Sequence, residues 1–352
     1  MKKLLMRLIV MGSVLVLLTG CGKQAAAEKP AAIEEPVSVE IFAMDTYMTL
    51  LAYGEHADEG LKKAEEEIRL LESLWSVTQE DSEIAVLNKN KTASVSDDTK
   101  SILTFAKQVS AQVEQTFDVT VFPIVKAWGF TTGAHRIPDE TELAVLTKYV
   151  DSDQIKIEGN QISLSGTNAE VDLGAIAKGY TSEKMKQVFL ENGITAGIVS
   201  LGGNVQTLGV KPNGTPWKVA IQDPFNTDDY IAVIEIGEKA VITSGSYQRY
   251  FERDGVIYHH LIDPKTGYPV CNGMNSVTIV ADVGTLADAL STAMFVMGKE
   301  KALAFWRQQY YNFEMIIIEK DGSITITEGL SETFLPVDKS TTVQIAAREN
   351  TE

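Results

Sequence analysis

One stretch of this chain, Asp172-Leu-Gly-Ala-Ile-Ala-Lys178-Gly-Tyr, constrains the fold more than any other. Its pattern predicts a strand that ends, a turn at glycine, and a helix with Lys178 in its first turn. Free backbone N–H groups, the positive end of the helix dipole and a cation together favour the binding of phosphate. An ordinary strand–turn–helix with a surface lysine has the same pattern, so the phosphate site needs a second signal.

That second signal lies far downstream, in Ala287-Asp288-Ala-Leu-Ser-Thr292. Residues four apart on a helix share a face, so the Asp288 carboxylate and the Thr292 hydroxyl would project together. Both are hard oxygen ligands of the kind that Mg²⁺ prefers. The competing interpretation is a capping box, Thr285-x-x-Asp288, in which no metal takes part. In that interpretation Thr292 simply bonds to the preceding helical turn.

The first 20 residues have the pattern of a bacterial export signal, with an apolar core at Leu8–Leu18 that is too short to span a membrane comfortably. Leu18-Thr-Gly-Cys21 matches a lipobox, so Cys21 is the predicted lipidation site; the alternative is an ordinary signal peptide with an incidental cysteine. Residues 21–36 are rich in Ala, Glu, Lys and Pro, which is typical of a flexible tether. The sequence therefore predicts a lipoprotein anchored to the extracytoplasmic face of the cell membrane.

The chain is acidic, with a formal net charge of −17 that becomes more negative when Lys2, Lys3 and Arg7 leave with the signal. Phosphate backbones would be repelled by such a protein, which argues against nucleic-acid binding. An anionic ligand must therefore be held by local positive groups.

We expect residues 37–352 to form an α+β fold, as a single compact domain or as two interlocked lobes with the cofactor site between them, because helical and strand-like patterns follow one another irregularly. Helices are expected at residues 58–75, 101–115, 175–192, 286–297 and 299–310. Strands are expected at residues 37–53, 117–122, 196–201, 217–222, 231–236, 241–243, 255–262, 276–281, 315–318 and 324–327, and two short strands around a tight turn at Gly159-Asn160 are expected within 154–164.

Several common signatures are missing from the sequence, including G-x-x-x-x-G-K-[ST], G-x-G-x-x-G and G-x-S-x-G. The histidines are not spaced for zinc. His260 is nevertheless well placed to act as a base or to pair with phosphate, because it precedes the turn Asp263-Pro-Lys-Thr-Gly267 at the end of a predicted strand. The polar segment Thr243–Tyr250 also follows a strand; it is either a ligand-binding loop or an ordinary surface loop.

Taken in order, these segments and several others form a specific set. The set is Met44-Asp-Thr46, Asp81-Ser-Glu-Ile with Leu87-Asn88, Phe117-Asp-Val-Thr120 with Trp128-Gly129, the Asp172 stretch, Leu201-Gly-Gly-Asn204, Thr243-Ser-Gly245, His260-x-Ile-Asp-Pro-x-Thr-Gly267 and Ala287-Asp-Ala-x-x-Thr292. In this order and spacing the chain resembles the ApbE family of FAD:protein FMN transferases, from Val37 to about Thr327.

The resemblance implies a reaction and a metal site. Members of the family bind FAD and Mg²⁺, split the pyrophosphate, move FMN to a threonine or serine hydroxyl of a partner protein, and release AMP. By resemblance, the metal ligands are the Ala175 carbonyl and the side chains of Asp288 and Thr292. Some members carry a further carboxylate where this chain has Ser291. The acceptor is expected to be an exported or membrane protein with an exposed Thr or Ser.

The resemblance also implies the residues that contact FAD, while the chemistry of the side chains indicates those that move protons. The expected FAD contacts are Met44, Thr78, Thr116, Phe117, Asp118, Asp172, Lys178 and Ile262. Thr78 occupies a position where relatives can have an aromatic residue. His260 is the predicted general base for the acceptor hydroxyl, and Asp288 is its rival.

Two other functions stay open at this point. The same site could hydrolyse FAD to FMN and AMP, as a pyrophosphatase, if water attacks in place of a protein hydroxyl. Alternatively, the chain could be a surface lipoprotein that binds a flavin without catalysis. Release of AMP in the presence of Mg²⁺ separates both enzymes from the binding protein.

Overall fold

The computed structural model describes residues 35–348, which belong to one compact unit. The predicted signal peptide (residues 1–20), the predicted lipidation site Cys21 and nearly all of the predicted tether lie outside these residues. Within residues 35–348, no helix combines the length and the apolar character needed to cross a membrane.

The strands are β1 (Val37–Ala43), β2 (Thr46–Ala52), β3 (Thr92–Ser94), β4 (Ile155–Glu158), β5 (Gln161–Leu164), β6 (Gly197–Leu201), β7 (Asn204–Leu208), β8 (Trp217–Gln222), β9 (Tyr230–Ile236), β10 (Ala240–Gly245), β11 (Tyr250–Arg253), β12 (Val256–His259), β13 (Met274–Ala281), β14 (Phe313–Glu319), β15 (Ile324–Thr327), β16 (Phe334–Pro336) and β17 (Val343–Ala346). The helices are α1 (Ala57–Trp75), α2 (Glu83–Asn90), α3 (Asp97–Gln112), α4 (Phe122–Trp128), α5 (Glu140–Leu146), α6 (Ala177–Glu191), α7 (Gly284–Met297) and α8 (Lys299–Arg307), with short 3-10 turns at Thr147–Tyr149, Ser152–Gln154 and Glu328–Leu330.

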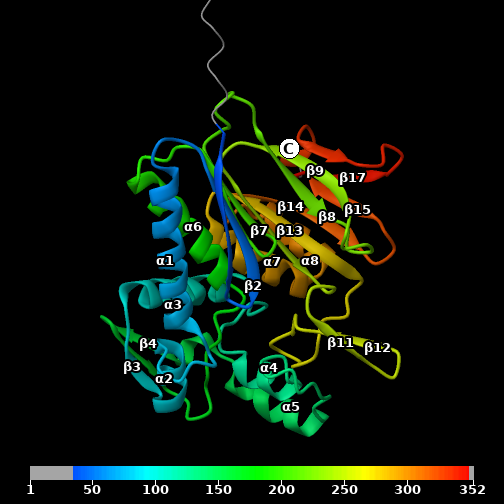
Figure 1. Cartoon of the computed structure of the whole chain (residues 1–352). Helices are drawn as coiled ribbons and strands as arrows, with labels where there is room; N and C mark the ends of the chain where they lie inside the picture. Colours follow the sequence, from blue (N-terminus) through cyan, green and yellow to red (C-terminus); the bar gives the residue numbers. More distant parts are fainter. Residues whose placement is uncertain (1–34, 349–352) are drawn as a thin grey trace, which may run out of the picture. The chain divides into compact units, whose positions relative to one another are not determined.

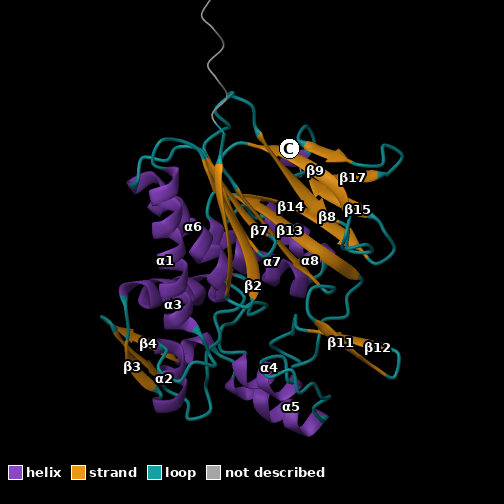
Figure 2. Cartoon of the chain, in the orientation of Figure 1, coloured by secondary structure: helices purple, strands orange, loops and turns teal. Residues whose placement is uncertain are grey.

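A nine-stranded sheet organises the fold, in the order β1-β2-β6-β7-β10-β13-β14-β15-β17 (Figure 2). Its neighbouring strands run antiparallel except β15 and β17, which are parallel. Helices α1, α6 and α7 cover one face of this sheet; Met48 and Leu50 of β2, for example, pack with Leu61 of α1 and Phe189 of α6. This packing places the first turn of α6 beside α7.

The opposite face of the main sheet carries a smaller layer, the three-stranded sheet β16-β9-β8. Residues of β8 are alternately buried and exposed, as expected for a strand with one face in the core. Its buried residues Trp217, Val219 and Ile221 pack with Val241 and Ile316 of the main sheet. In Figure 1, β8 and β9 accordingly lie over the β13–β15 side of that sheet.

Two further groups of elements complete the structure, in the lower part of Figure 1. The three-stranded sheet β3-β5-β4 packs with α2 and α3. The hairpin β11–β12 shares an aromatic cluster with α4 and α5, in which Trp128 contacts Phe251 and Tyr258. The predicted α+β class is confirmed, since helices and strands occur in irregular order around an incompletely covered sheet.

The continuous strand expected at residues 37–53 is wrong. The chain forms a two-residue hairpin instead, with Met44 and Asp45 at the turn between β1 and β2. Both turn residues have positive φ, 49° and 61°, which only a few per cent of residues other than glycine adopt. The pattern lacked the Asn-Gly or Asp-Gly pair that usually marks such a turn, so the alternation appeared continuous.

The strand expected at residues 117–122 is also wrong. Residues 117–120 form turns, and α4 begins at Phe122 with Pro123 in its first turn. Proline usually interrupts a strand or helix, but it is tolerated in the first turn of a helix. The first N–H groups of a helix have no acceptor within the helix, so a residue that lacks an N–H loses no hydrogen bond there. The predicted strand before the glycine turn at Asp172 is similarly reduced to one bridge, between Val121 and Glu170.

Other elements match the predictions closely. The hairpin turn at Gly159-Asn160 and the strand 217–222 are present as expected. Helix α6 begins at Ala177, so Lys178 does lie in its first turn. Gly193 follows the helix with φ +75°, the left-handed conformation typical of a residue just beyond a helix C-terminus.

Candidate active site

The structure brings every predicted site residue of the folded part to one cleft, with a volume of about 1270 Å³. These residues come from distant parts of the sequence, and their meeting in space was not required by the fold class. They are Met44, Thr78, Thr116, Phe117, Asp118, Asp172, Ala175, Lys178, His260, Ile262, Asp288 and Thr292. Their placement fits a shared site, while the role of each residue stays a prediction.

The crossing of α6 and α7 fixes the position of Asp288. The backbone N–H of Gly179 donates a hydrogen bond to Asp288 Oδ2, at 2.7 Å. A Cβ atom at Gly179 would lie 2.3 Å from the Gly284 carbonyl oxygen and 2.5 Å from the Asp288 Cβ, so only glycine permits this approach. A carboxylate thereby accepts from the first turn of α6, where the helix dipole favours negative charge.

The capping-box interpretation of Thr285 and Asp288 is wrong. Helix α7 begins at Gly284, and its N-cap residue, Val283, makes no side-chain cap. The Thr285 hydroxyl donates to Glu183 Oε2 of α6 at 2.8 Å, and Asp288 serves α6, not its own helix.

The hydroxyl groups of Ser244, Ser291 and Thr292 lie close together where β10 meets α7. Ser244 Oγ lies 3.4 Å from Thr292 Oγ1 and 2.8 Å from Ser291 Oγ. The Ser291 hydroxyl is fully buried and donates to the Asp288 carbonyl oxygen at 2.8 Å. In the described part of the chain, no three His, Cys, Asp or Glu residues lie close enough together to hold a metal ion. One carboxylate among neutral oxygens does not suit zinc, but it suits Mg²⁺, which usually keeps several waters and shares phosphate ligands.

Asp172 lies at the entrance to α6. Its Oδ1 accepts a hydrogen bond from the Gly174 N–H at 2.8 Å, and its own N–H donates to the Val119 carbonyl oxygen at 2.8 Å. Burial raises the pKa of the Asp172 carboxyl, and the Gly174 N–H and the charges of Arg249 and Lys178 oppose this shift. An acidic group is therefore held among cations beside the first turn of α6.

The backbone of Arg249 sets the tautomer of His260. The Arg249 carbonyl oxygen lies 3.0 Å from the His260 backbone nitrogen and 3.1 Å from its ring Nδ1. A carbonyl can only accept, so Nδ1 carries the hydrogen and Nε2 is left with a lone pair. Burial, together with the positive charges of Arg249 and Lys178, lowers the pKa of His260 to about 3. The ring is thus neutral over a wide pH range.

Asp118 is used by the fold itself. Its Oδ1 accepts from the Thr120 N–H and hydroxyl, at 2.8 and 2.6 Å, and its Oδ2 accepts from the Ser152 N–H at 2.9 Å and the Ser110 hydroxyl at 3.3 Å. Burial raises the pKa of the Asp118 carboxyl, and these hydrogen bonds oppose the shift. Both carboxylate oxygens are therefore used to hold the loop of residues 116–121 in place.

The remaining predicted contacts lie around the mouth of the cleft. The Met44 N–H donates to Glu72 Oε1 at 2.6 Å, which ties the β1–β2 turn to α1. Thr78 is exposed, with its Oγ1 3.0 Å from Ser76 Oγ. Ile262 is 6% exposed and forms an isolated bridge with Pro269.

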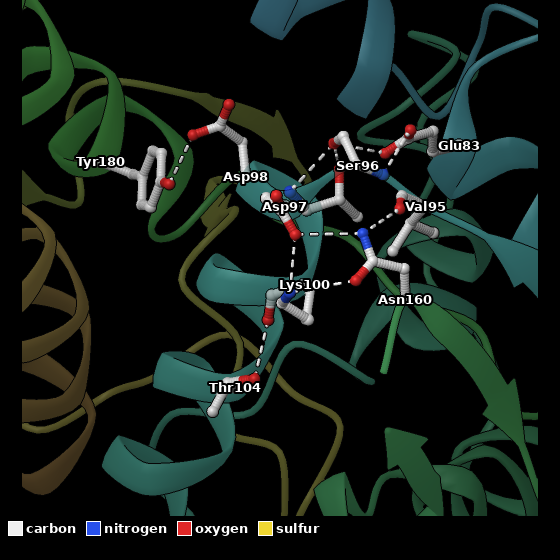
Figure 3. Close-up of polar contacts among 10 residues, drawn as sticks. Glu83, Val95, Ser96, Asp97, Asp98, Lys100, Thr104, Asn160 and Tyr180 are labelled. Carbon is white, nitrogen blue, oxygen red and sulfur yellow. Dashed lines mark hydrogen bonds and ion pairs between the residues drawn. The ribbon is translucent and has the colours of Figure 1, made fainter. Parts of the chain in front are cut away.

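A polar network outside the cleft braces α6 against α3 (Figure 3). The Tyr180 hydroxyl donates to Asp98 Oδ1 at 2.7 Å, and Lys184 Nζ lies 2.8 Å from the same oxygen. Helix α3 is itself capped by Ser96, whose hydroxyl accepts from the Thr99 N–H at 3.2 Å while Glu83 accepts from Ser96. The helix that carries Lys178 is therefore held on both sides, by α7 and by α3.

Sequence reasoning missed several residues of the cleft. Arg249 lines it, and its Nη2 donates to the Phe130 carbonyl oxygen at 3.0 Å. Asn204 and Tyr247 also line it, and each has a buried polar atom without a protein partner, Nδ2 and OH respectively. Two sequence features could have indicated them: Arg249 is a cation in the polar segment Thr243–Tyr250, and Asn204 directly follows Gly-Gly.

Comparisons with known proteins place the chain among flavin transferases. The model of the ApbE family matches residues 44–317. A Vibrio cholerae protein named FAD:protein FMN transferase is 33% identical over 332 residues, which is 92% of this chain and 96% of that protein. An Escherichia coli K12 protein of the same name is 29% identical over 334 residues, covering 91% of this chain and 95% of that protein.

Solved structures show the same likeness. The crystal structure of the ApbE protein of Thermotoga maritima superposes with a TM-score of 0.80 at 30% identity, covering 85% of this chain and 99% of that chain. The flavin transferase ApbE of Vibrio cholerae gives a TM-score of 0.76 at 28% identity, with the same coverage of 85% and 99%.

Proposed function

The chain belongs to the ApbE family, and we propose that it transfers the FMN moiety of FAD to a Thr or Ser hydroxyl of an acceptor protein and releases AMP. The observation that carries this proposal is the convergence of His260, Asp288 and Lys178 in one cleft. A base, a hard anionic ligand and a cation at a helix start are what an attack on a pyrophosphate requires.

In the proposed reaction the acceptor oxygen attacks the phosphorus of the FMN half. The new bond joins that oxygen to phosphorus, and the bond to the bridging oxygen breaks, so that AMP leaves with its electrons. The acceptor proton moves to Nε2 of His260, the nitrogen left unprotonated by the Arg249 carbonyl. Lys178, Arg249 and the first turn of α6 lie where they can stabilise charge on the phosphates.

The low pKa of His260 is compatible with this role. The positive charges of Arg249 and Lys178 contribute to lowering this pKa. The phosphates of bound FAD would offset both charges and so raise the basicity of the ring in the complex. In the free protein His260 is neutral at neutral pH, so the Nε2 lone pair is present.

The residues present fit a magnesium ion. We assign its protein ligands to Asp288, Thr292 and the Ala175 carbonyl, since one carboxylate with neutral oxygens suits this ion. When bound, Mg²⁺ would neutralise part of the pyrophosphate charge. The sequence pattern of residues 1–36 leads us to place the protein on the extracytoplasmic face of the cell membrane, held by lipid at Cys21, with an exported or membrane protein as acceptor.

The test uses the protein with FAD, Mg²⁺ and the exported and membrane proteins of the source cell, with and without EDTA. A metal-dependent mass gain of one FMN phosphoester on a Thr or Ser, with release of AMP, is expected. AMP and FMN with no modified protein would make the chain a pyrophosphatase. Intact FAD in every reaction would make it a binding protein.

A further inference from the structure

The cleft extends beyond the residues assigned to FAD and Mg²⁺. Its lining also includes residues of the β6–β7 hairpin and of β8, among them Ser200, Val205, Lys218 and Ala220. The proposed transfer needs a second substrate, a polypeptide whose hydroxyl must reach Nε2 of His260. This part of the cleft is continuous with the predicted catalytic residues, so a polypeptide bound here could reach them.

Strand β8 presents an open edge to the cleft. It is the last strand of the sheet β16-β9-β8, and among the described residues β9 is its one paired neighbour. The consecutive residues Lys218, Val219 and Ala220 all line the cleft. Successive side chains of a strand point to opposite faces, so consecutive residues can share a cavity only where the edge faces it. An open edge offers unpaired backbone N–H and C=O groups.

Beside this edge the main sheet is only partly covered. Val205 of β7 pairs with Val241 of β10 on one side and with Ser200 of β6 on the other, so the three side chains share one face. Val241 is 2% exposed beneath the smaller sheet, whereas Ser200 and Val205 are half-buried and line the cleft. The three-stranded sheet thus ends at β8. A fourth strand beside β8 would cover Val205 and Ser200.

The uncovered face also exposes apolar surface farther from β8. Phe42 and Tyr47 are directly opposite each other on β1 and β2, with ring centroids 5.1 Å apart, and are 57% and 81% exposed. Tyr47 lies two residues before Thr49, which pairs with Ser200. The aromatic pair is therefore on the same face of the main sheet as Ser200 and Val205. Exposed aromatic residues at a polar rim are typical of protein interfaces.

From these features we infer that an extended segment of the acceptor protein binds as a fourth strand along the edge of β8, over Ser200 and Val205. The segment would pair its backbone with β8 and bring its Thr or Ser to Nε2 of His260. Strand addition gives affinity through main-chain hydrogen bonds and leaves the side chains free to set specificity. The inference rests on the proposed function.

The experiment begins with synthetic peptides, each containing one threonine flanked by random residues. The full folded protein, FAD and Mg²⁺ are incubated with them, and labelled peptides are identified by the mass of FMN. If AMP never appears, the proposed function itself fails. If AMP appears with an FMN-labelled protein acceptor but no peptide is ever labelled, the acceptor is not recognised as an extended segment and the inference is overturned.

A labelled peptide with its threonine replaced by valine then serves as an unreactive probe for hydrogen exchange. Its binding should slow amide exchange within residues 217–222 and leave residues 334–336 unchanged, since β16 is the opposite edge of the same sheet. Protection at another surface, with β8 unaffected, would contradict the inference. This measurement uses the unmodified protein, so it does not depend on a variant that folds.

A substitution gives an independent test. Ser200→Trp places an indole on the floor beside β8 and should raise the KM for the peptide at least about tenfold, with little change in kcat. Leu335→Trp is the matched control, because Leu335 is 44% exposed on β16. FAD binding, followed by flavin fluorescence, shows that each variant is folded. An unchanged KM in a folded Ser200→Trp protein would overturn the inference.

Discussion

The carboxylate of Asp288 accepts a hydrogen bond from the backbone N–H of Gly179, at 2.7 Å. The residue predicted to bind the metal on α7 is therefore attached to the first turn of α6, next to Lys178, the residue predicted to bind phosphate. Two motifs more than one hundred residues apart in the sequence become one site through this contact.

Gly179→Ala should damage both stability and transfer. The added Cβ would lie 2.3 Å from the Gly284 carbonyl oxygen and force α6 away from α7. Overpacking of this kind lowers the free energy of unfolding by about 1–3 kcal/mol. Urea unfolding and AMP release measure the two effects. Gln187→Ala, on the exposed side of α6, is the control and should change stability by less than about 0.5 kcal/mol; an equal loss there would refute the steric argument.

Asp288→Asn should weaken the affinity for Mg²⁺ without unfolding the protein. Asparagine keeps an oxygen that can accept from the Gly179 N–H, but it removes the negative charge that attracts a hard cation. We expect the Mg²⁺ concentration for half-maximal AMP release to rise at least about tenfold. Titration of AMP release with Mg²⁺ measures this. An unchanged Mg²⁺ dependence would remove Asp288 from the metal site.

His260→Ala should lower FMN transfer by about 10²-fold or more, the usual contribution of a general base. The affinity for FAD, measured by flavin fluorescence, should change much less. His56→Ala is the control, since His56 is exposed at the start of α1. Transfer at a normal rate by His260→Ala would eliminate it as the base and leave Asp288 as the candidate.

The pH profile of kcat/KM for FAD reports on the free protein. Because burial and the charges of Arg249 and Lys178 lower the pKa of His260 to about 3, no acidic limb is expected near its ordinary value of 6.5. Removing one of these cations, in Arg249→Met, should raise this pKa and move the limb to higher pH. A limb near pH 6.5 in the unmodified protein would show that His260 is not held neutral.

Acid should destabilise the fold through His259. Its Nε2–H donates to the Val270 carbonyl oxygen at 2.9 Å, and burial lowers its pKa from 6.5 to about 4. Below about pH 6.5 the unfolded chain therefore binds a proton that the folded chain does not, so stability falls as pH falls towards 4. Urea unfolding of His259→Gln, which keeps a donor for Val270, should show a shallower loss than the unmodified protein; identical slopes would contradict this.

Local patterns predicted some parts of the site and not others, for physical reasons. Lys178 was placed correctly because a glycine turn before a helical pattern is decided by nearby residues. The Met44–Asp45 turn was missed because its strained backbone is held by Glu72, which lies on another element. The capping box at Thr285 was a sound local interpretation, but tertiary contacts took both of its residues.

The missed cleft residues show the same limit. Arg249, Asn204 and Tyr247 matter because of what lies opposite them in the folded chain, and no spacing in the sequence records that. Asp118 lines the cleft, and its contact with FAD stays a prediction; its carboxylate also holds the loop together, which the sequence pattern did not indicate.

An open strand edge also has a consequence for solubility. Backbone groups left unpaired on β8 can be used by any extended chain, including β8 of a second copy, and exposed edges of this kind promote aggregation. Lys218 places a charged side chain on this edge strand, which disfavours such pairing. The net charge of −17 adds a general repulsion between copies. The acidity that disfavours nucleic-acid binding thus also disfavours pairing of the open β8 edge with a second copy of the protein.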